Sequence, residues 1–150
     1  MLKNHFYDVY DLQHLSDIET VFKTDGLVGL NVTIPFKEKV VPYLDELSDE
    51  AEKTGAVNCI LIKDQVKKGY NTDVFGFEKT LVLHRKDFHD SALVLGNGGA
   101  AKAVKYVLEQ HQIPYQTVSR NADLNFGNLT AETIRKNRLI IQCTPVGTFP

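Results

Sequence analysis

The chain has 150 residues, a formal net charge of −2 and a hydrophobic fraction of 43%, enough for one complete domain or two partial ones. Its balanced charge gives no broad basic surface for nucleic acid, and no apolar run approaches the roughly 20 residues needed to cross a bilayer. The N-terminus lacks the apolar core of a signal peptide, and the widely separated Cys59 and Cys143 are expected to be free, buried thiols. We therefore predict a cytoplasmic protein without a nucleic-acid or membrane partner.

Short strands and helices are expected to alternate at the start of the chain. The aromatic-rich residues 6–10 and the apolar run 27–32 predict strands, the second of them buried. A capping-box pattern at residues 16–19 predicts a helix that continues through Phe22. A further helix is expected over residues 35–42, because proline suits the first helical position at one end and terminates or interrupts a helix at the other.

The next segments carry clearer turn and cap signals. Ser48 precedes two acidic residues, which predicts a short helix that Gly55 closes. Residues 58–63 and 66–70 predict a hairpin around Asp64 and Gln65. Thr72 is then expected to cap a helix that runs to about residue 83.

A polar stretch at residues 83–90 interrupts the hydrophobic pattern, so we expect two domains, 1–82 and 83–150, with a boundary near this stretch. The second half reads as a βαβ unit with more following. Its expected strands are 92–95, 115–119 and 139–143, and its expected helices are 100–110 and 130–136. Strands that alternate with helices predict a parallel, doubly wound sheet, and therefore an α/β fold.

A glycine-rich loop joins the first strand of this unit to its helix. Its residues are Gly96, Asn97, Gly98, Gly99 and Ala100. A tight turn at the carboxyl end of a strand exposes backbone N–H groups at a helix N-terminus, where they can bind a pyrophosphate. Glycine permits close approach of the phosphate and positive φ angles, for which we single out Gly98. The alternative is a purely structural turn.

The end of the next strand indicates which dinucleotide would bind. An acidic residue in this region binds the ribose 2′-hydroxyl of NAD. Here Ser119 and Arg120 occupy the region, and the nearest acid is Asp123. A guanidinium can pair with a 2′-phosphate that a carboxylate would repel, which favours NADP over NAD. The alternative is that Arg120 is a solvated loop residue.

Two charged residues follow predicted strands in the first half. Lys37 comes after a strand and a turn, and Asp73 begins a helix after a strand. Open α/β sheets build their sites at the carboxyl ends of strands. If the two side chains meet, they could exchange a proton with a substrate hydroxyl. Judged from spacing alone, each is more typical of a solvated surface charge.

Six motifs, in this order, resemble those of the shikimate dehydrogenase family. They are residues 31–38 (Asn-Val-Thr-Ile-Pro-Phe-Lys-Glu), 55–58 (Gly-Ala-Val-Asn), 69–73 (Gly-Tyr-Asn-Thr-Asp), 96–100 (Gly-Asn-Gly-Gly-Ala), 119–121 (Ser-Arg-Asn) and 144–147 (Thr-Pro-Val-Gly). The resemblance implies a substrate domain followed by a Rossmann-like NADP-binding domain, both incomplete. It also implies reversible NADPH-dependent reduction of 3-dehydroshikimate to shikimate in aromatic amino-acid biosynthesis, by a monomer or homodimer.

The resemblance also assigns roles to residues. Lys37 and Asp73 correspond to the catalytic residues, and Thr33 and Asn58 to residues that orient substrate hydroxyls. The residues expected at the NADP site are Gly96, Asn97, Gly98, Gly99, Ala100, Ser119, Arg120 and Thr144. No metal site is predicted. The sequence departs from the family at Asn97, where Ala is usual, at Gln142 in place of Asn, and at Thr148 in place of Met.

The family pattern extends beyond both ends of these residues. The resemblance implies an earlier strand with a Ser-x-Ser segment for the substrate carboxylate, and roughly a hundred later residues. The 150 residues alone are therefore expected to have little or no dehydrogenase activity. The alternatives are a non-catalytic dinucleotide-binding module or fragment, and a quinate/shikimate paralogue that prefers NAD, against which Arg120 argues.

Overall fold

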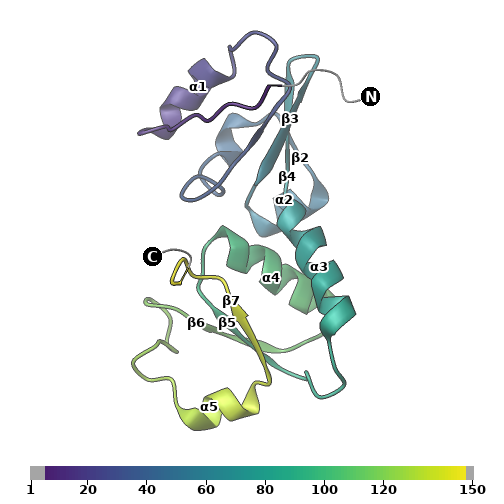
Figure 1. Cartoon of the computed structure of the whole chain (residues 1–150), viewed down its shortest axis with the longest axis vertical. Coiled ribbons are helices and arrows are strands. Elements are labelled where there is room, and N and C mark those ends of the chain that lie inside the picture. Colours follow the sequence, from purple (N-terminus) through teal and green to yellow (C-terminus); the bar gives the residue numbers. More distant parts are fainter. Residues whose placement is uncertain (1–5, 148–150) are drawn as a thin grey trace.

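The computed structural model describes residues 6–147, which contain two β-sheets (Figure 1). The first sheet has the order β1 (Gly29–Asn31), β3 (Cys59–Lys63), β4 (Val66–Tyr70) and β2 (Glu46–Leu47). β3 is antiparallel to both β1 and β4, whereas β2 is parallel to β4. The sheet is therefore mixed.

The predicted hairpin and the helix before it are confirmed. Asp64 and Gln65 join β3 to β4 with φ angles of 50° and 67°, and positive φ at both central residues is typical of a tight two-residue hairpin turn. Helix α2 (Asp49–Thr54) begins where the Ser48 hydroxyl accepts a hydrogen bond from the Ala51 N–H at 3.3 Å. It ends at Gly55, whose φ of 59° lies in the left-handed region that glycine adopts readily.

The second sheet is the parallel α/β arrangement expected from the sequence. Its order is β6 (Tyr115–Val118), β5 (Ala92–Leu95) and β7 (Leu139–Gln142), with both outer strands parallel to β5. Helix α4 (Gly99–Gln110) connects β5 to β6, and α5 (Ala131–Lys136) precedes β7. The fold class is therefore confirmed as α/β.

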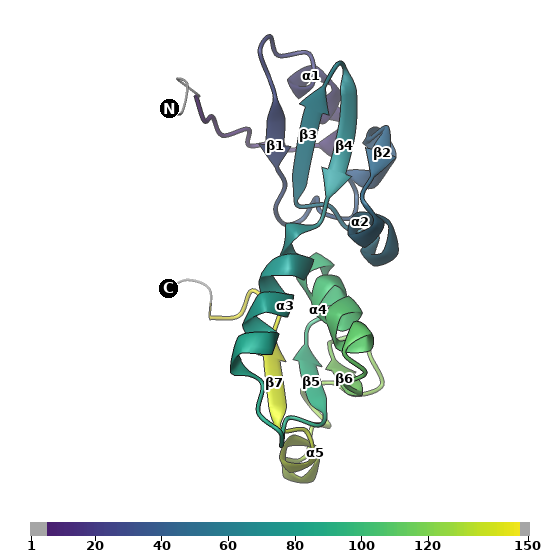
Figure 2. The ribbon, with the colours of Figure 1, turned by 90° about the vertical axis from the view of Figure 1, so that its right-hand side faces the viewer.

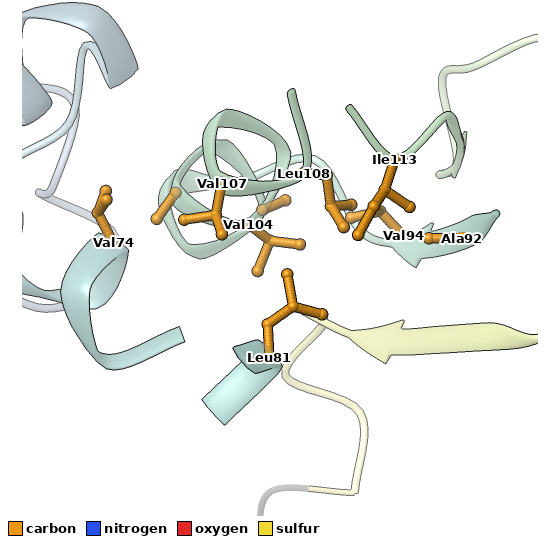
Figure 3. Packing of buried hydrophobic residues seen from close by; sticks show 10 residues of the cluster. Val74, Leu81, Ala92, Val94, Val104, Val107, Leu108 and Ile113 are labelled. Carbon is orange, nitrogen blue, oxygen red and sulfur yellow. The ribbon is translucent and has the colours of Figure 1, made fainter. Parts of the chain in front are cut away.

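Helix α3 (Thr72–His84) leads from the first sheet to the second and packs beside α4 (Figure 2). Its inward-facing Val74 and Leu81 join a core that α4 and β5 complete (Figure 3). The buried members of this core from α4 include Ala103, Val104, Val107 and Leu108, as their 3.6-residue spacing predicts. A second core, built on residues such as Val40, Val57 and Ile60, lies under the first sheet.

Three expectations for the N-terminal segment are wrong. Residues 6–10 form no strand, and Phe6 is 97% exposed, because no described strand pairs with this segment. The capping box does not form, and the segment begins as a 3₁₀ helix (Leu15–Asp17) before α1 (Ile18–Val21). The expected buried strand at 27–32 is only β1, which is short and half-buried.

The helix expected over residues 35–42 is also wrong. Residues 34–40 are turns, followed by a 3₁₀ helix at Val41–Tyr43. The Lys37 carbonyl accepts a hydrogen bond from the Val57 N–H at 2.7 Å. A long-range contact thus uses the carbonyl that a helix would pair with a residue four positions later. Strand β2 was not predicted, and the residue preceding α3 is Asn71 rather than Thr72.

Candidate active site

Lys37 and Asp73 meet at the end of the first sheet. The Lys37 ammonium donates a hydrogen bond to Oδ2 of Asp73 at 2.6 Å. The Lys37 side chain is 18% exposed and that of Asp73 is 35% exposed, so the pair is partly shielded but open on one side. Lys37 comes from the turns after β1, and Asp73 from the first turn of α3. A cation and a carboxylate in contact beside solvent can exchange a proton with a bound hydroxyl.

Asn58 fixes the second oxygen of the carboxylate. Its Nδ2 donates to Oδ1 of Asp73 at 2.8 Å, while its Oδ1 accepts from the Thr72 N–H at 2.9 Å. The main chain of Asn58 is held as well. Its N–H donates to the Tyr70 carbonyl at 3.0 Å, and its carbonyl accepts from the Val32 N–H at 2.9 Å. Asn58 therefore connects the first sheet to the start of α3 and orients Asp73.

Two neighbours of Asp73 contribute to the site without having been assigned a binding role from the sequence. Thr72 shares its hydroxyl with Asn58, with Oγ1 lying 3.0 Å from Nδ2 and 3.2 Å from Oδ1. Asn71 is buried and donates from Nδ2 to the Thr54 hydroxyl at 3.0 Å, which anchors the start of α3 to α2. The sequence signal for both is their place beside Asp73 in the 69–73 motif, where Thr72 alone is expected to cap the helix.

Thr33, predicted to orient substrate, lies between β1 and the lysine on the exposed surface. Its carbonyl accepts from the Phe36 N–H at 2.9 Å, which forms the turn that leads to Lys37. No hydrogen bond of the Thr33 hydroxyl joins it to the Lys37–Asp73 pair within the described residues, and the side chain is exposed.

The glycine loop follows β5 directly, as predicted, but its strained glycine is Gly96 and not Gly98. Gly96 has φ of 112°, and a Cβ there would lie 3.0 Å from the Cys143 backbone. Gly98 has φ of −87° and open space where a Cβ would project. Tight packing against the end of β7 fixes Gly96, whereas Gly98 leaves an exposed approach to the start of α4.

The loop retains features that suit a phosphate. Gly98 is the residue preceding α4, and no side chain caps this helix. The N–H groups of the first helical turn lack intrahelical partners by geometry, so an uncapped and accessible N-terminus can donate to an anion. Asn97, Gly98 and Ala100 are exposed. These residues fit a dinucleotide pyrophosphate.

The loop and the lysine face each other. A Cβ on Gly99 would approach Cβ of Lys37 to 3.1 Å, so only glycine allows this contact without displacement. Beside it, the Lys102 ammonium of α4 forms an ion pair with Glu38 at 2.6 Å. The Lys37–Asp73 pair and the start of α4 are therefore adjacent parts of one region, although they come from opposite halves of the chain.

The remaining predicted nucleotide residues lie at the carboxyl ends of β6 and β7. Ser119 is half-buried and Arg120 is exposed in the turn after β6, where Arg120 forms no ion pair within the described residues. After β7, the Thr144 hydroxyl donates to Oε1 of Gln142 at 3.0 Å. Gln142, a departure from the family pattern, therefore shapes the turn at Thr144. Thr148 lies outside the described residues.

Cys59 and Cys143 are free, as predicted, but each is half-buried. Burial raises the pKa of the Cys143 thiol, and the positive charge of Lys105 partly opposes this shift. Among residues 6–147, no helix is long and apolar enough to cross a membrane.

Comparison with known proteins gives a consistent result. Residues 3–60 match the family described as shikimate dehydrogenase substrate binding domain. The chain is 40% identical to a shikimate dehydrogenase (NADP(+)) of Clostridium beijerinckii, over 96% of this chain and 58% of that protein. The chain thus spans about half the length of the curated relatives it matches.

Solved structures agree. The shikimate 5-dehydrogenase of Thermus thermophilus, in complex with NADP(H) and shikimate, is 31% identical with a TM-score of 0.72, over 88% of this chain and 53% of that one. A quinate dehydrogenase of Corynebacterium glutamicum, in complex with NAD, is 35% identical with a TM-score of 0.62, over 73% of this chain and 40% of that one.

The fold and the site define an α/β protein in which a lysine–aspartate pair faces a glycine loop of dinucleotide-binding type. Within that class, residues 3–60 match the shikimate dehydrogenase substrate binding domain, and the chain as a whole is similar to about half the length of shikimate dehydrogenases.

Proposed function

We propose that the chain carries the catalytic and cofactor-binding residues of an NADP-dependent shikimate dehydrogenase, which reversibly reduces 3-dehydroshikimate to shikimate in aromatic amino-acid biosynthesis. The observation that carries this proposal is the 2.6 Å contact between Lys37 and Asp73, in a region where Gly99 of the glycine loop packs against Lys37. The substrate hydroxyl and the cofactor would therefore meet at the same residues. A solved structure similar to this chain, at 31% identity, is a shikimate 5-dehydrogenase in complex with NADP(H) and shikimate.

In this proposal, Lys37 exchanges the proton of the reacting hydroxyl, and Asp73 holds its ammonium in place. Asn58 keeps the Asp73 carboxylate in its orientation through the 2.8 Å hydrogen bond, and together with Thr33 it orients substrate hydroxyls. The start of α4 would bind the pyrophosphate of the cofactor. When bound, NADPH would supply the hydride for reduction, and NADP⁺ would accept it in the reverse direction. Gly96, Asn97, Gly98, Gly99 and Ala100 form that cradle, with Thr144 beside it.

Ser119 and Arg120 are proposed to bind the 2′-phosphate of NADP. Arg120 is exposed and unpaired by any described carboxylate, so its guanidinium is available for a phosphate. A quinate dehydrogenase with NAD is the second candidate, because a quinate dehydrogenase solved with NAD shares the fold. Arg120 favours the NADP-linked reading over this one.

We further propose that the two functional parts are domains at 1–82 and 83–150, with the boundary near the end of α3. The protein is proposed to be cytoplasmic and to act as a monomer or homodimer on a small-molecule substrate.

The test uses the chain at micromolar concentration, so that even slow hydride transfer is measurable. NADPH absorbance at 340 nm is followed with 3-dehydroshikimate, and NADP⁺ reduction is followed with shikimate. Parallel reactions contain NAD⁺ with shikimate or with quinate. Any hydride transfer, however slow, is expected with NADP and shikimate rather than with NAD⁺ and quinate. Turnover only with NAD⁺ and quinate would replace the proposal with the second candidate. A chain that neither transfers hydride nor binds NADPH would contradict both.

A further inference from the structure

Lys105 occupies an unusual position for a lysine. It lies on α4 near residues that pack into the core, and it is half-buried. Long side chains on a helix lean toward its N-terminus. The Lys105 side chain accordingly extends back along α4, and its ammonium donates a hydrogen bond to Oδ1 of Asn97 in the glycine loop. The positive charge of Lys105, from the second turn of α4, therefore lies at the proposed phosphate cradle.

This ammonium has a neutral hydrogen-bond partner rather than an ionic one. No carboxylate of residues 6–147 forms an ion pair with Lys105. Glu109, one helical turn away, instead accepts a hydrogen bond from the Tyr115 hydroxyl at 2.6 Å. Burial lowers the pKa of Lys105, although the nearby Cys143 and Glu109 act in the opposite direction. A half-buried cation without a carboxylate partner carries a desolvation cost that a neighbouring anion would offset.

The identity of the loop residue matters for this contact. Asn97 of the glycine loop accepts the hydrogen bond from Lys105 through its side-chain oxygen. An alanine could not hold the ammonium in this place, because it offers no side-chain acceptor. The amide oxygen of Asn97 therefore gives Lys105 a fixed position at the turn.

We propose that Lys105 is an anion-binding residue of the cofactor site, held by Asn97 so that its ammonium adds a positive charge to the cradle for a pyrophosphate group. The ligand class is a diphosphate, either free or within a dinucleotide. As a statement about cofactor affinity, the proposal rests on the proposed function. It predicts that Lys105 governs binding of the phosphates and not the proton transfer at Lys37.

The experiment measures the dissociation constants of NADPH and of inorganic pyrophosphate by calorimetry, for the chain and its variants, from low to high salt. Lys105→Gln keeps a donor for Asn97 but removes the charge, and should weaken both ligands about tenfold at low salt, as expected for a hydrogen bond to a charged group. Lys105→Arg should retain binding within about threefold, because it keeps the charge. The affinity of Lys105→Gln should also depend less on salt, since salt screens charge interactions.

Two controls separate charge from structure. Lys136→Met removes the same charge from α5, where Lys136 is an exposed partner of Glu132, and should leave binding unchanged. Asn97→Ala keeps the Lys105 ammonium but removes the acceptor that fixes its position. The double variant Asn97→Ala, Lys105→Gln should bind the ligands no more weakly than Lys105→Gln alone, because the two residues act together. Circular dichroism and thermal melting establish that each variant is folded.

The outcomes distinguish this proposal from the proposed function. If pyrophosphate binding depends on Lys105 but NADPH does not bind, the anion site stands and the dehydrogenase proposal fails. If NADPH binds the parent chain and Lys105→Gln equally at low salt, the role of Lys105 is overturned and the dehydrogenase proposal stands. Failure of the parent chain to bind either ligand would overturn both.

Discussion

The ammonium of Lys37 lies 2.6 Å from the carboxylate of Asp73, although 36 positions separate them in the chain. The two residues come from different segments, Lys37 from the turns after β1 and Asp73 from the start of α3. The carbonyl of Lys37 accepts a hydrogen bond from the Val57 N–H, which positions Lys37. The N–H of Thr72, beside Asp73, donates to the side chain of Asn58, which positions Asp73. Because Val57 and Asn58 are adjacent, one short segment sets both halves of the pair.

The first prediction concerns Asn58. Asn58→Ala removes the bond to Asp73 Oδ1 and the acceptor for the Thr72 N–H, so Asp73 loses its orientation. We expect turnover to fall about 10- to 100-fold and the free energy of unfolding to fall by about 1–3 kcal/mol. Turnover assays and urea unfolding measure the two effects. Thr72→Ser, which keeps the hydroxyl, is the matched control, and equal activity of Asn58→Ala and the parent chain would show that Asn58 does not position Asp73.

The glycine loop gives a second prediction with two separable results. Gly98→Val should fold normally, because Gly98 has φ of −87° and open space around a Cβ, but its side chain should block the phosphate approach and abolish NADPH binding. Gly96→Val should instead destabilise the fold, because Gly96 has φ of 112° and contacts the Cys143 backbone. Thermal melting and NADPH titration distinguish the variants. If Gly98→Val binds NADPH normally, the glycine loop is only a structural turn and not a phosphate site.

Cofactor choice is the third prediction. The exposed guanidinium of Arg120 should favour NADPH over NADH by about 1–3 kcal/mol through a charge-assisted contact with the 2′-phosphate. In Arg120→Ala this preference should largely disappear, while NADH affinity stays unchanged. Fluorescence titration with both cofactors measures the difference. A preference that survives in the variant would assign the 2′-phosphate to another residue.

Tyr115 provides a prediction on pH. Burial, together with the hydrogen bond to Glu109, raises the pKa of Tyr115 from 10.0 to about 12. The folded state therefore favours the neutral phenol, and its contribution to stability is fully present below pH 10 and is lost as the pH rises through about 12. Absorbance at 295 nm should show a late phenol titration that Tyr115→Phe lacks. If the two titrations coincide above about pH 11, the hydrogen bond to Glu109 does not protect the phenol.

The sequence predicts several elements in both halves of the chain well because their signals are local. The apolar spacing within α4, the cap at Ser48 and the turn at Gly55 each act over a few residues, and each is present in the structure. The alternation of strands and helices in the sequence is enough to predict the parallel second sheet. These elements would be recognised without any knowledge of distant contacts.

The errors arise where distant segments decide the outcome. Residues 6–10 have the composition of a strand, yet a strand requires a partner and none of the described strands pairs with them. The turns at 34–40 replace a helix because Val57 binds the Lys37 carbonyl. Hydrophobic periodicity could not predict that Lys37 contacts Asp73. The resemblance to a family suggested a shared role for the two residues. Neither local propensity nor spacing could have indicated the role of Asn58 in orienting Asp73.

The most direct test of the account is the turnover of Lys37→Met. Methionine keeps the length of the side chain but cannot exchange a proton, so turnover of shikimate with NADP⁺ should fall about 10²- to 10⁴-fold, the usual contribution of a positioned general acid–base. NADPH affinity should change little, and Lys37→Met combined with Asp73→Asn should lose less than the two single losses together. Unchanged turnover in folded Lys37→Met protein would contradict the account.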